Sequence, residues 1–239
     1  MKVEFIGSGS IFTSVNSASY LINDKILVDI PNGCCKALKR MGKDIIDIEY
    51  VFITHFHGDH FFDIPFLLTE IYSRGSKKIT LIGGSELKSK VEAITKLCFP
   101  NSYNKYLSEI EITYVDCNEK ISIDDLKINS VKVEHGRMKE AYGYIFAINN
   151  KSIFFTGDTS LCSNVEKLCN ISSYIIIDTT LEIGNKAHIG INDIEYLATK
   201  YNNVKFITTH MGNDIKNLIE KLNLKNVISG EDGFKFKVD

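Results

Sequence analysis

The chain has 239 residues, of which 44% are hydrophobic, and this is enough to build one sizeable core. Its 28 Lys and Arg residues are balanced by 30 Asp and Glu residues, so a net charge of −2 excludes a protein that gathers nucleic acid or anionic membrane through its overall field. No run approaches the roughly 18 apolar residues that span a bilayer, and MKVEFIGSGS lacks the apolar stretch of an export signal, so we expect one soluble domain over residues 1–239.

Short strands are expected at the start of the chain. KVEFIG, ASYLI and KILVDI have strand character, and Asn23-Asp24 between the last two predicts a hairpin. CCKALKRM has apolar residues at helical spacing and ends before Gly42, which predicts a helix. IEYVFI is a continuous apolar run, typical of a strand that is covered on both faces. The segment THFHGDH follows this strand directly.

The rest of the chain predicts helices and strands that alternate around a β-rich middle. FFDIPFLLTEIYS and SELKSKVEAITKL are expected to be helices, separated by the strand KITLI. The middle strands are IEITYV, KISI, LKINSVKV, YGYIFAI and SIFFTG. The last third has a helix near NVEKLC, strand YIIID, helix INDIEYLATKY, strand KFITT, helix NDIKNLIEKL, and strands NVIS and FKFKV. Two β-to-α halves with outer helices predict an α/β fold, a four-layer αββα sandwich.

The segment THFHGDH carries four side chains that can bind metal. His55 and His57 alternate along an extended segment, so they point to the same side and can bind one ion. We expect the turn at Gly58 to direct Asp59 and His60 toward a second ion. Glycine is expected there because a side chain would crowd the metal and because glycine adopts backbone angles forbidden to other residues. A His-rich surface loop is the alternative interpretation.

The motif HxHxDH after a buried strand resembles the first metal motif of the metallo-β-lactamase superfamily. VEHG at 133–136 is similar to its next histidine element, FTGDT at 155–159 to its bridging-aspartate element, and TTH at 208–210 to its last ligand. The resemblance runs from residue 3 to about residue 215. It implies that the first metal is bound by His55, His57 and His135. It also implies that the second metal is bound by Asp59, His60 and His210, and that Asp158 bridges the two metals.

This set of seven nitrogen and oxygen ligands favours two divalent metal ions, with zinc first and manganese or iron as alternatives. Two ions about 3.5–4 Å apart lower the pKa of a bridging water, so we expect hydroxide rather than a side chain as the nucleophile. Singly, His135 and His210 are equally well explained as structural or surface histidines, and Asp158 as a residue near a helix start. Five of the six histidines fall at ligand positions, which favours the metal site.

The sixth histidine, His188 in AHIGIND, resembles the histidine loop of the ribonuclease Z-like phosphodiesterases within the superfamily. In that branch an acid at a preceding strand end holds the histidine, and Asp178 in IDTTL takes this place, where the branch usually has glutamate. The resemblance implies that Asp59, His188 and Asp178 are catalytic, with His188 and Asp178 steadying the transition state and protonating the leaving oxygen. An exposed histidine near a helix start is the alternative.

Two further segments resemble the same branch. FIGSGS is similar to its N-terminal glycine loop, and FDIPFLL to its helix after the metal motif. GSGS differs from the dinucleotide pattern GxGxxG and no helix follows it, so we expect no nucleotide cofactor.

These features favour a phosphodiesterase that acts on small or cyclic nucleotide-like phosphodiesters. The alternative is a thioester, lactone or β-lactam hydrolase that attacks a carbonyl with the same site. An oxygen-reducing diiron protein is disfavoured because that branch resembles HxExDH and His57 stands where its glutamate would be. A scaffold without catalysis is disfavoured because all seven ligand positions are filled.

Substrate size is inferred from one short segment. A ribonuclease Z that processes tRNA is expected to carry a tRNA-gripping arm between the elements of His135 and Asp158. Only 22 residues separate the two, and they are used by two strands and a turn. Structured tRNA is therefore an unfavoured partner, and a nucleic-acid substrate would need a local basic patch. We expect specificity to depend on loops such as 69–78 and 98–109.

The cysteines indicate the compartment. All six are scattered without CxxC pairs, so we expect free or buried thiols in a reducing, cytoplasmic environment. No membrane partner is expected. Homodimerisation is implied by the resemblance alone.

Overall fold

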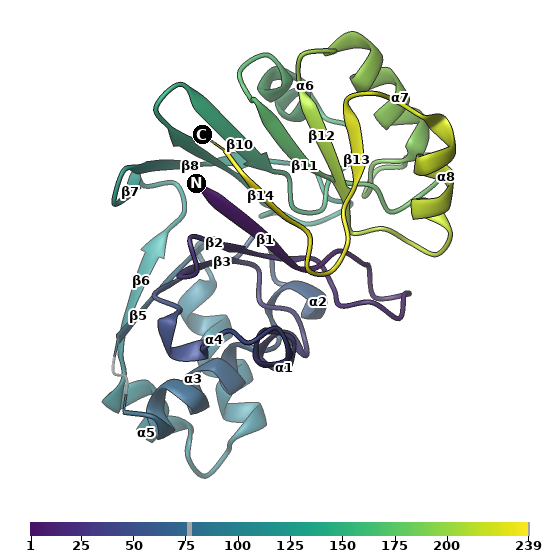
Figure 1. The fold of residues 1–239 in the computed structure, drawn as a ribbon. Helices are drawn as coiled ribbons and strands as arrows, with labels where there is room; N and C mark the ends of the chain where they lie inside the picture. Colours follow the sequence, from purple (N-terminus) through teal and green to yellow (C-terminus); the bar gives the residue numbers. More distant parts are fainter. Residues whose placement is uncertain (76–77, 239) are drawn as a thin grey trace.

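The computed structural model describes residues 1–75 and 78–238, and in this part of the chain two seven-stranded sheets pack face to face between helices (Figure 1). The first sheet has the order β14-β1-β2-β3-β4-β5-β6. Its strands are antiparallel from β14 to β3 and parallel from β3 to β6. Their bounds are Lys2–Gly7 (β1), Ser19–Ile22 (β2), Ile26–Val28 (β3), Tyr50–Phe52 (β4), Lys78–Gly83 (β5), Glu111–Asp116 (β6) and Lys235–Lys237 (β14).

The second sheet has the order β13-β12-β11-β10-β9-β8-β7. It is antiparallel from β7 to β10 and parallel from β10 to β13. This places the carboxyl ends of β10, β11 and β12 at one edge, where the candidate site lies. The bounds are Ile121–Ile123 (β7), Leu126–Lys132 (β8), Tyr142–Ile148 (β9), Lys151–Phe155 (β10), Tyr174–Asp178 (β11), Lys205–Thr209 (β12) and Val227–Ser229 (β13).

Helices cover the outer face of each sheet (Figure 1). The first sheet is covered by Cys34–Arg40 (α1), the 3-10 turn Ile45–Asp47 (η1), Ile64–Ser73 (α3), Leu87–Cys98 (α4) and Tyr103–Glu109 (α5), and the short helix Gly58–Phe61 (α2) lies at its edge. The second sheet is covered by Ser163–Cys169 (α6), Ile191–Lys200 (α7) and Ile215–Leu222 (α8). The four layers match the αββα sandwich that the sequence predicts. No helix among the described residues is long and apolar enough to cross a membrane.

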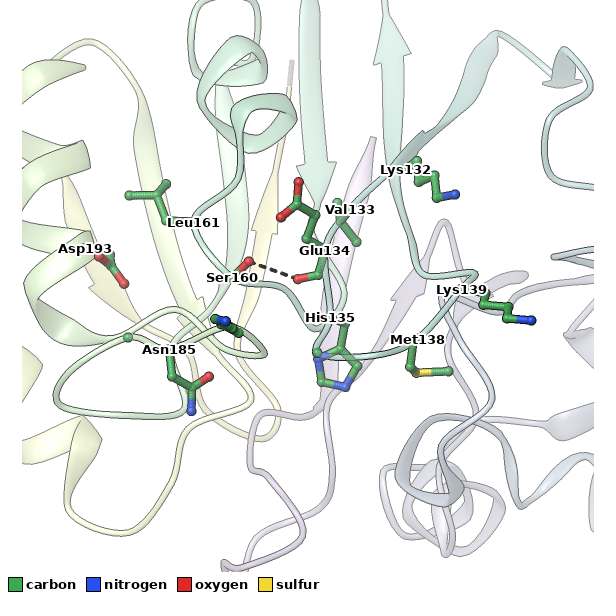
Figure 2. A pocket seen from close by; sticks show the side chains of 13 residues that line it. Lys132, Val133, Glu134, His135, Met138, Lys139, Ser160, Leu161, Asn185 and Asp193 are labelled. Carbon is green, nitrogen blue, oxygen red and sulfur yellow. Dashed lines mark hydrogen bonds between the residues drawn. The ribbon is translucent and has the colours of Figure 1, made fainter.

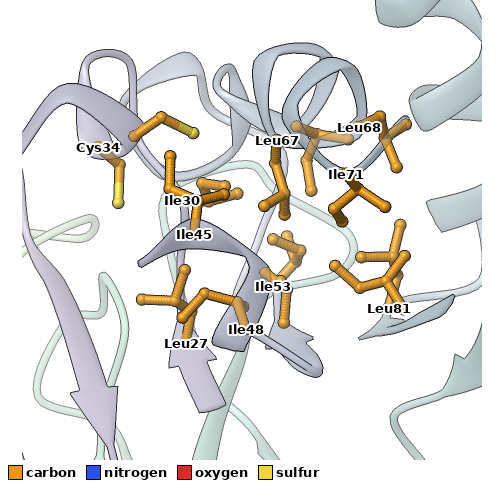
Figure 3. Packing of buried hydrophobic residues seen from close by; sticks show 14 of the residues in the cluster. Leu27, Ile30, Cys34, Ile45, Ile48, Ile53, Leu67, Leu68, Ile71 and Leu81 are labelled. Atoms are coloured by element: carbon orange, nitrogen blue, oxygen red, sulfur yellow. The ribbon is translucent and has the colours of Figure 1, made fainter. Parts of the chain in front are cut away.

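Three apolar clusters hold the layers together. One lies between the first sheet and its helices, where Leu27, Ile53 and Leu81 meet Leu67 and Ile71 (Figure 3). A second lies between the two sheets, and a third between the second sheet and α6 to α8. Each fully buried aliphatic or aromatic side chain contributes about 1.5–3 kcal/mol by leaving water. The middle cluster joins strands of both sheets.

The predicted elements are found close to their expected positions, with one informative difference. Segment 98–109, expected to be a specificity loop, contains helix α5, and most of the segment 69–78 is the end of α3 and the first residue of β5, while residues 76 and 77 lie outside the described part. Tyr106 of α5 packs against Tyr72 and Phe99, with ring centroids 5.2 and 5.5 Å apart. A seven-residue helix is too short to show a clear period in the sequence.

Candidate metal centre

The seven predicted ligand residues lie together where strands of both sheets end. His55 and His57 follow β4, and Asp59 and His60 belong to α2. The remaining three, His135, Asp158 and His210, follow β8, β10 and β12. Three overlapping groups of side chains have their donor atoms within 4.8 Å of one another. These groups are His55, His57, His135 and Asp158; Asp59, His60 and His210; and Asp158, Asp178, His188 and His210.

The first group is a cluster of three imidazoles. Nδ1 of His57 lies 3.0 Å from Nε2 of His55 and 3.2 Å from Nε2 of His135. Three nitrogens about 2.0–2.1 Å from one tetrahedral zinc are separated by about 3.3–3.4 Å, so this spacing fits one ion. Oδ2 of Asp158 lies 3.9 Å from Nε2 of both His55 and His135.

The second group contains the other set of predicted ligands. Oδ2 of Asp59 lies 3.3 Å from Nε2 of His210 and 3.7 Å from Nε2 of His60. Oδ1 of Asp158 lies 3.3 Å from Nε2 of His60, and its Oδ2 lies 3.4 Å from Nε2 of His210. Asp158 therefore faces both groups, as a bridging carboxylate would.

Two buried atoms test whether the residues fit metal ions. Nε2 of His60 and Oδ1 of Asp158 are buried, yet neither has a hydrogen-bond partner among the described residues. Leaving a buried polar atom without a partner costs about 1–3 kcal/mol. A divalent cation on these two atoms would remove that cost, and the all nitrogen and oxygen donor set suits zinc, manganese or iron. The residues fit a metal site.

Four of the imidazoles are held by a partner on the ring nitrogen that faces away from the cluster. Nδ1 of His60 donates to Asp29 at 2.8 Å, and Nδ1 of His135 donates to the carbonyl of Ala187 at 2.8 Å. The other two partners are hydroxyls, since Thr54 accepts from His55 at 3.0 Å and Thr180 accepts from His210 at 2.8 Å. Each contact fixes the tautomer and frees Nε2 for a metal ion.

Asp29 is a supporting residue that the sequence reasoning missed. Its Oδ2 accepts from Nδ1 of His60 and from the hydroxyl of Thr54, each at 2.8 Å, and its Oδ1 accepts from the backbone N–H of Thr54. One carboxylate thus orients His60 in the second group and, through Thr54, His55 in the first. The sequence did contain a signal, because Asp29 lies within the apolar run KILVDI, and a carboxylate is costly to bury there unless it has a partner.

Two residues of the cluster, Asp29 and His210, have an unusual backbone conformation. Asp29 and His210 have φ angles of 61° and 51°, in the left-handed region. A residue other than glycine held there costs on the order of 1–3 kcal/mol, and such residues cluster at functional sites.

Burial and charge set the protonation of the cluster. Burial and the neighbouring His60 hold the pKa of His55 well below its usual value, and burial with His135 lowers the pKa of His57. Burial opposes a charged His60, but Asp158 and Asp29 outweigh it and raise its pKa well above the usual value. For Asp158, burial is outweighed by His210 and His60, so its pKa is well below the usual range. The positive partners around Asp158 therefore favour its charged carboxylate form.

His188 and Asp178 form the pair that the sequence predicts. Nδ1 of His188 donates to Oδ2 of Asp178 at 2.9 Å, so the shorter aspartate reaches the ring. Thr180 donates from its hydroxyl to Oδ1 of Asp178 at 2.6 Å and accepts from His210, which joins this pair to the second group of ligands. Burial lowers the pKa of His188, but the bond to Asp178 and the charges of Asp178 and Asp158 outweigh it and raise the pKa.

A pocket of about 560 Å³ opens above this cluster. Besides cluster residues, its lining includes Ile11, Phe12, Arg137 and Met138. None of the described residues in 69–75, 78 and 98–109 lines this pocket. These described residues belong to or lie next to α3, α4, α5 and β5 in the first sheet and its outer helices.

A second hollow of about 960 Å³ adjoins this pocket and shares His135, Gly136 and Met138 with it. Figure 2 shows His135 at its centre, with the Lys132 and Lys139 side chains directed away from the imidazole. Ser160 donates to the carbonyl of Glu134 there at 3.1 Å, which holds the strand end that carries His135. Lys132 and Lys139 therefore do not direct their ammonium groups at the imidazole of His135.

The explanation for Gly58 needs correction. Gly58 is absent from the residues with positive φ in the described chain, so it does not need the backbone freedom of glycine. A Cβ at Gly58 would lie 2.9 Å from the ring of Phe62 instead of crowding the metal ligands. Gly157, beside Asp158, has the conformation expected of a required glycine, with φ of 61° and a Cβ position 2.9 Å from Cβ of Thr54.

The fold and the cluster together define a metallo-hydrolase of the metallo-β-lactamase fold, in its ribonuclease Z-like branch. Among curated proteins the chain is similar to ribonuclease Z of Macrococcus caseolyticus (strain JCSC5402), at 22% identity over 95% of this chain and 94% of the relative. Among solved structures it resembles the metallo-β-lactamase fold protein YhfI from Bacillus subtilis, with a TM-score of 0.79, 16% identity and 98% of each chain covered. A diphosphatase from the PhnP family gives a TM-score of 0.77 and 19% identity, covering 100% of this chain and 98% of that one.

A family model matches nearly the whole chain. The model of the family described as anti-Pycsar protein Apyc1 matches residues 1–231, and the chain belongs to this family.

Proposed function

We propose that the protein is a two-metal phosphodiesterase that acts on small or cyclic nucleotide-like phosphodiesters. The observation that carries the proposal is the pair of His188 and Asp178 beside the two ligand groups. Ribonuclease Z, the name of the curated relatives, is also a phosphodiesterase. We propose the sequence-derived ligands His55, His57, Asp59, His60, His135, Asp158 and His210 as the metal site, with zinc first and manganese or iron as alternatives.

When bound, two such ions supply a water of lowered pKa and neutralise charge on the phosphoryl oxygens. The chain itself positions the acid. Asp178 accepts the Nδ1 proton of His188, so the ring has one orientation and Nε2 remains for a substrate oxygen. The raised pKa of His188 keeps a proton available for the leaving oxygen, which is the role of a general acid.

A small substrate is supported by three observations. The pocket has about 560 Å³, which lies in the range of small-molecule sites. The segment between His135 and Asp158 consists mainly of β9 and β10, as the sequence predicts, so a hairpin occupies the place of the expected arm. The alignment with the Macrococcus enzyme extends over 290 positions, more than this chain has residues, so that relative has segments without a counterpart here.

The test is hydrolysis of bis-p-nitrophenyl phosphate by metal-loaded wild type, Asp59→Ala and His188→Ala, with metal content determined on each sample. We expect Asp59→Ala to be inactive and His188→Ala to retain metal and lose activity about 10²- to 10⁴-fold. Ile183→Ala is the matched control, because Ile183 is in the same loop, is 76% exposed and lines neither pocket.

Three outcomes would contradict the proposal. A fully metal-loaded wild type that cleaves thioesters or lactones but no phosphodiester would indicate the carbonyl hydrolase instead. A His188→Ala variant with wild-type rates would remove His188 from the chemistry. Cleavage of intact tRNA would contradict the small substrate.

We also propose a single domain over residues 1–239, a cytoplasmic location and a homodimer. All six cysteines in the described chain are free thiols, and five are buried, which supports a reducing environment. Sedimentation of the purified protein tests the dimer.

A further inference from the structure

The loop of residues 10–15, called the lip below, exposes large apolar side chains beside the metal pocket. Ile11, Phe12 and Val15 are 60%, 71% and 48% exposed. Ile11 and Phe12 line the pocket of the metal cluster, whereas Val15 lines a separate pocket with Gly212. Adjacent exposed apolar side chains beside a cluster of polar, metal-binding side chains indicate a ligand that covers them.

One carboxylate fixes both ends of the lip. Oδ1 of Asp232 accepts from the backbone N–H and the hydroxyl of Ser8 at 3.1 and 3.2 Å. Oδ2 of Asp232 accepts from the backbone N–H and the side-chain amide of Asn16 at 3.0 and 2.7 Å. The backbone N–H of Ser10 donates to the carbonyl of Met211, the residue after His210, at 3.0 Å. The lip therefore has a defined position relative to the metal cluster.

The rest of the lining divides the pocket by chemistry. The metal cluster gives the pocket a polar part, and Arg137 adds a guanidinium that forms no ion pair within residues 1–75 and 78–238. Met138 adds a flexible apolar side chain to those of Ile11 and Phe12. The pocket volume of about 560 Å³ is much larger than one phosphate group requires. The lining thus suits an anion that carries a flat, apolar group.

We infer that Phe12 stacks on the nucleobase of the substrate, with Ile11 beside it, and that Asp232 is the positioning residue that holds Phe12 there. This inference rests on the proposed function and adds to it the residues that contact and position the base. Every base has a π-face, so stacking on an aromatic ring tolerates different bases. The expected preference is for nucleoside over alkyl phosphodiesters rather than for one base over another.

The test compares two substrates with the same leaving group, the p-nitrophenyl ester of thymidine 5′-monophosphate and methyl p-nitrophenyl phosphate. We expect wild type to have the higher kcat/KM on the thymidine ester. In Phe12→Ala the ratio of the two kcat/KM values falls about tenfold through a higher KM for the thymidine ester, and Phe12→Tyr retains the ratio. Asp232→Ala lowers the ratio in the same direction. Metal content is measured on each variant and stays at the wild-type value.

Val15→Ala is the matched control, because this apolar side chain is exposed on the same lip and lines the other pocket. It is expected to leave the ratio unchanged. If wild type cleaves both esters and Phe12→Ala keeps the wild-type ratio, the inference is wrong while the phosphodiesterase stands. If metal-loaded wild type cleaves neither ester, the proposed function fails and the inference fails with it.

Discussion

The floor and the rim of the metal pocket are built in opposite ways. On the floor, His60 and Asp158 are 1% and 3% exposed, and buried neighbours such as Asp29 fix the orientation of the ligands. On the rim, Phe12 is 71% exposed, and Arg137 has no ion-pair partner in the part of the chain that the structure describes. The candidate ligands on the floor are therefore held by overlapping hydrogen bonds, whereas few neighbours constrain the side chains on the rim.

The sharpest way to break this comparison is Asp178→Asn on the floor. The variant keeps the size of the side chain and loses the charge that accepts the Nδ1 proton of His188. We expect kcat on bis-p-nitrophenyl phosphate to fall about 10²-fold or more, because the imidazole loses its fixed tautomer. Metal analysis is the control, since Thr180 can still contact His210. A wild-type kcat with full metal would show that the pair is structural.

Asp29→Asn tests whether one carboxylate supports both ligand groups. Asparagine tolerates the φ angle of 61° at this position, so the backbone is expected to be retained. Loss of the charge weakens the bonds from His60 and Thr54, and we expect metal affinity to fall about 10- to 100-fold. Competition with a chromogenic chelator measures the affinity. Thr54→Val is the matched variant, because it removes the hydroxyl that links Asp29 to His55 and leaves the bond between His60 and Asp29 in place.

If Asp29 supports both ligand groups, Asp29→Asn lowers the affinity for both metal ions, and Thr54→Val lowers the affinity for one of them. If each variant instead loses affinity for only one ion, and to the same extent, Asp29 does not support both ligand groups.

Tyr144→Phe tests whether a hydrogen bond from the core between the sheets stabilises the segment that leads to the metal ligands. Tyr144 is fully buried between the sheets and donates to the carbonyl of Ile53 at 2.8 Å, two residues before His55. Removing the hydroxyl leaves that carbonyl without this donor, and we expect unfolding by urea to show a loss of about 1–2 kcal/mol. Phe146→Leu, in the same cluster, is a control that changes packing without a hydrogen bond. Unchanged stability in Tyr144→Phe would show that another donor replaces the hydroxyl.

The sequence predicts the floor far better than the rim for a physical reason. Metal ligands need particular residue types at particular strand ends, so HxHxDH, His135, Asp158 and His210 can be recognised before the fold is known. Asp29 and Thr180 support them through contacts between residues distant in the chain, and no local spacing indicates those contacts. Phe12 was passed over because an exposed aromatic in a loop has no pattern until the pocket beside it is seen.

The helices and strands of the sandwich follow from apolar periodicity because burial selects for it. Helix α5 is the exception, since none of its residues is fully buried and its seven residues cover fewer than two turns and leave little pattern to read.

The smallest expected effect concerns an ion pair far from the floor. Asp24 is half exposed, and its hydrogen bonds with Lys43 and Lys2 hold its pKa below the usual value. Because the folded pKa is lowered, this contribution to stability is present above about pH 4 and is lost as the pH falls through the lowered pKa. Solvent screens the pair, so we expect Asp24→Asn to cost about 0.2–1 kcal/mol at neutral pH and less in about 1 M salt.

Asparagine suits this test because Asp24 has a φ angle of 59°, which asparagine also adopts. Urea unfolding of both proteins at about pH 7 and about pH 3.5 gives the difference in free energy, and effects of the metal ligands cancel between them. If the difference in the free energy of unfolding is the same at about pH 3.5, Asp24 stabilises the protein through the turn conformation and not through its charge. A difference above about 2 kcal/mol at neutral pH would contradict the comparison itself, since an exposed pair would then contribute as much as a buried contact of the floor.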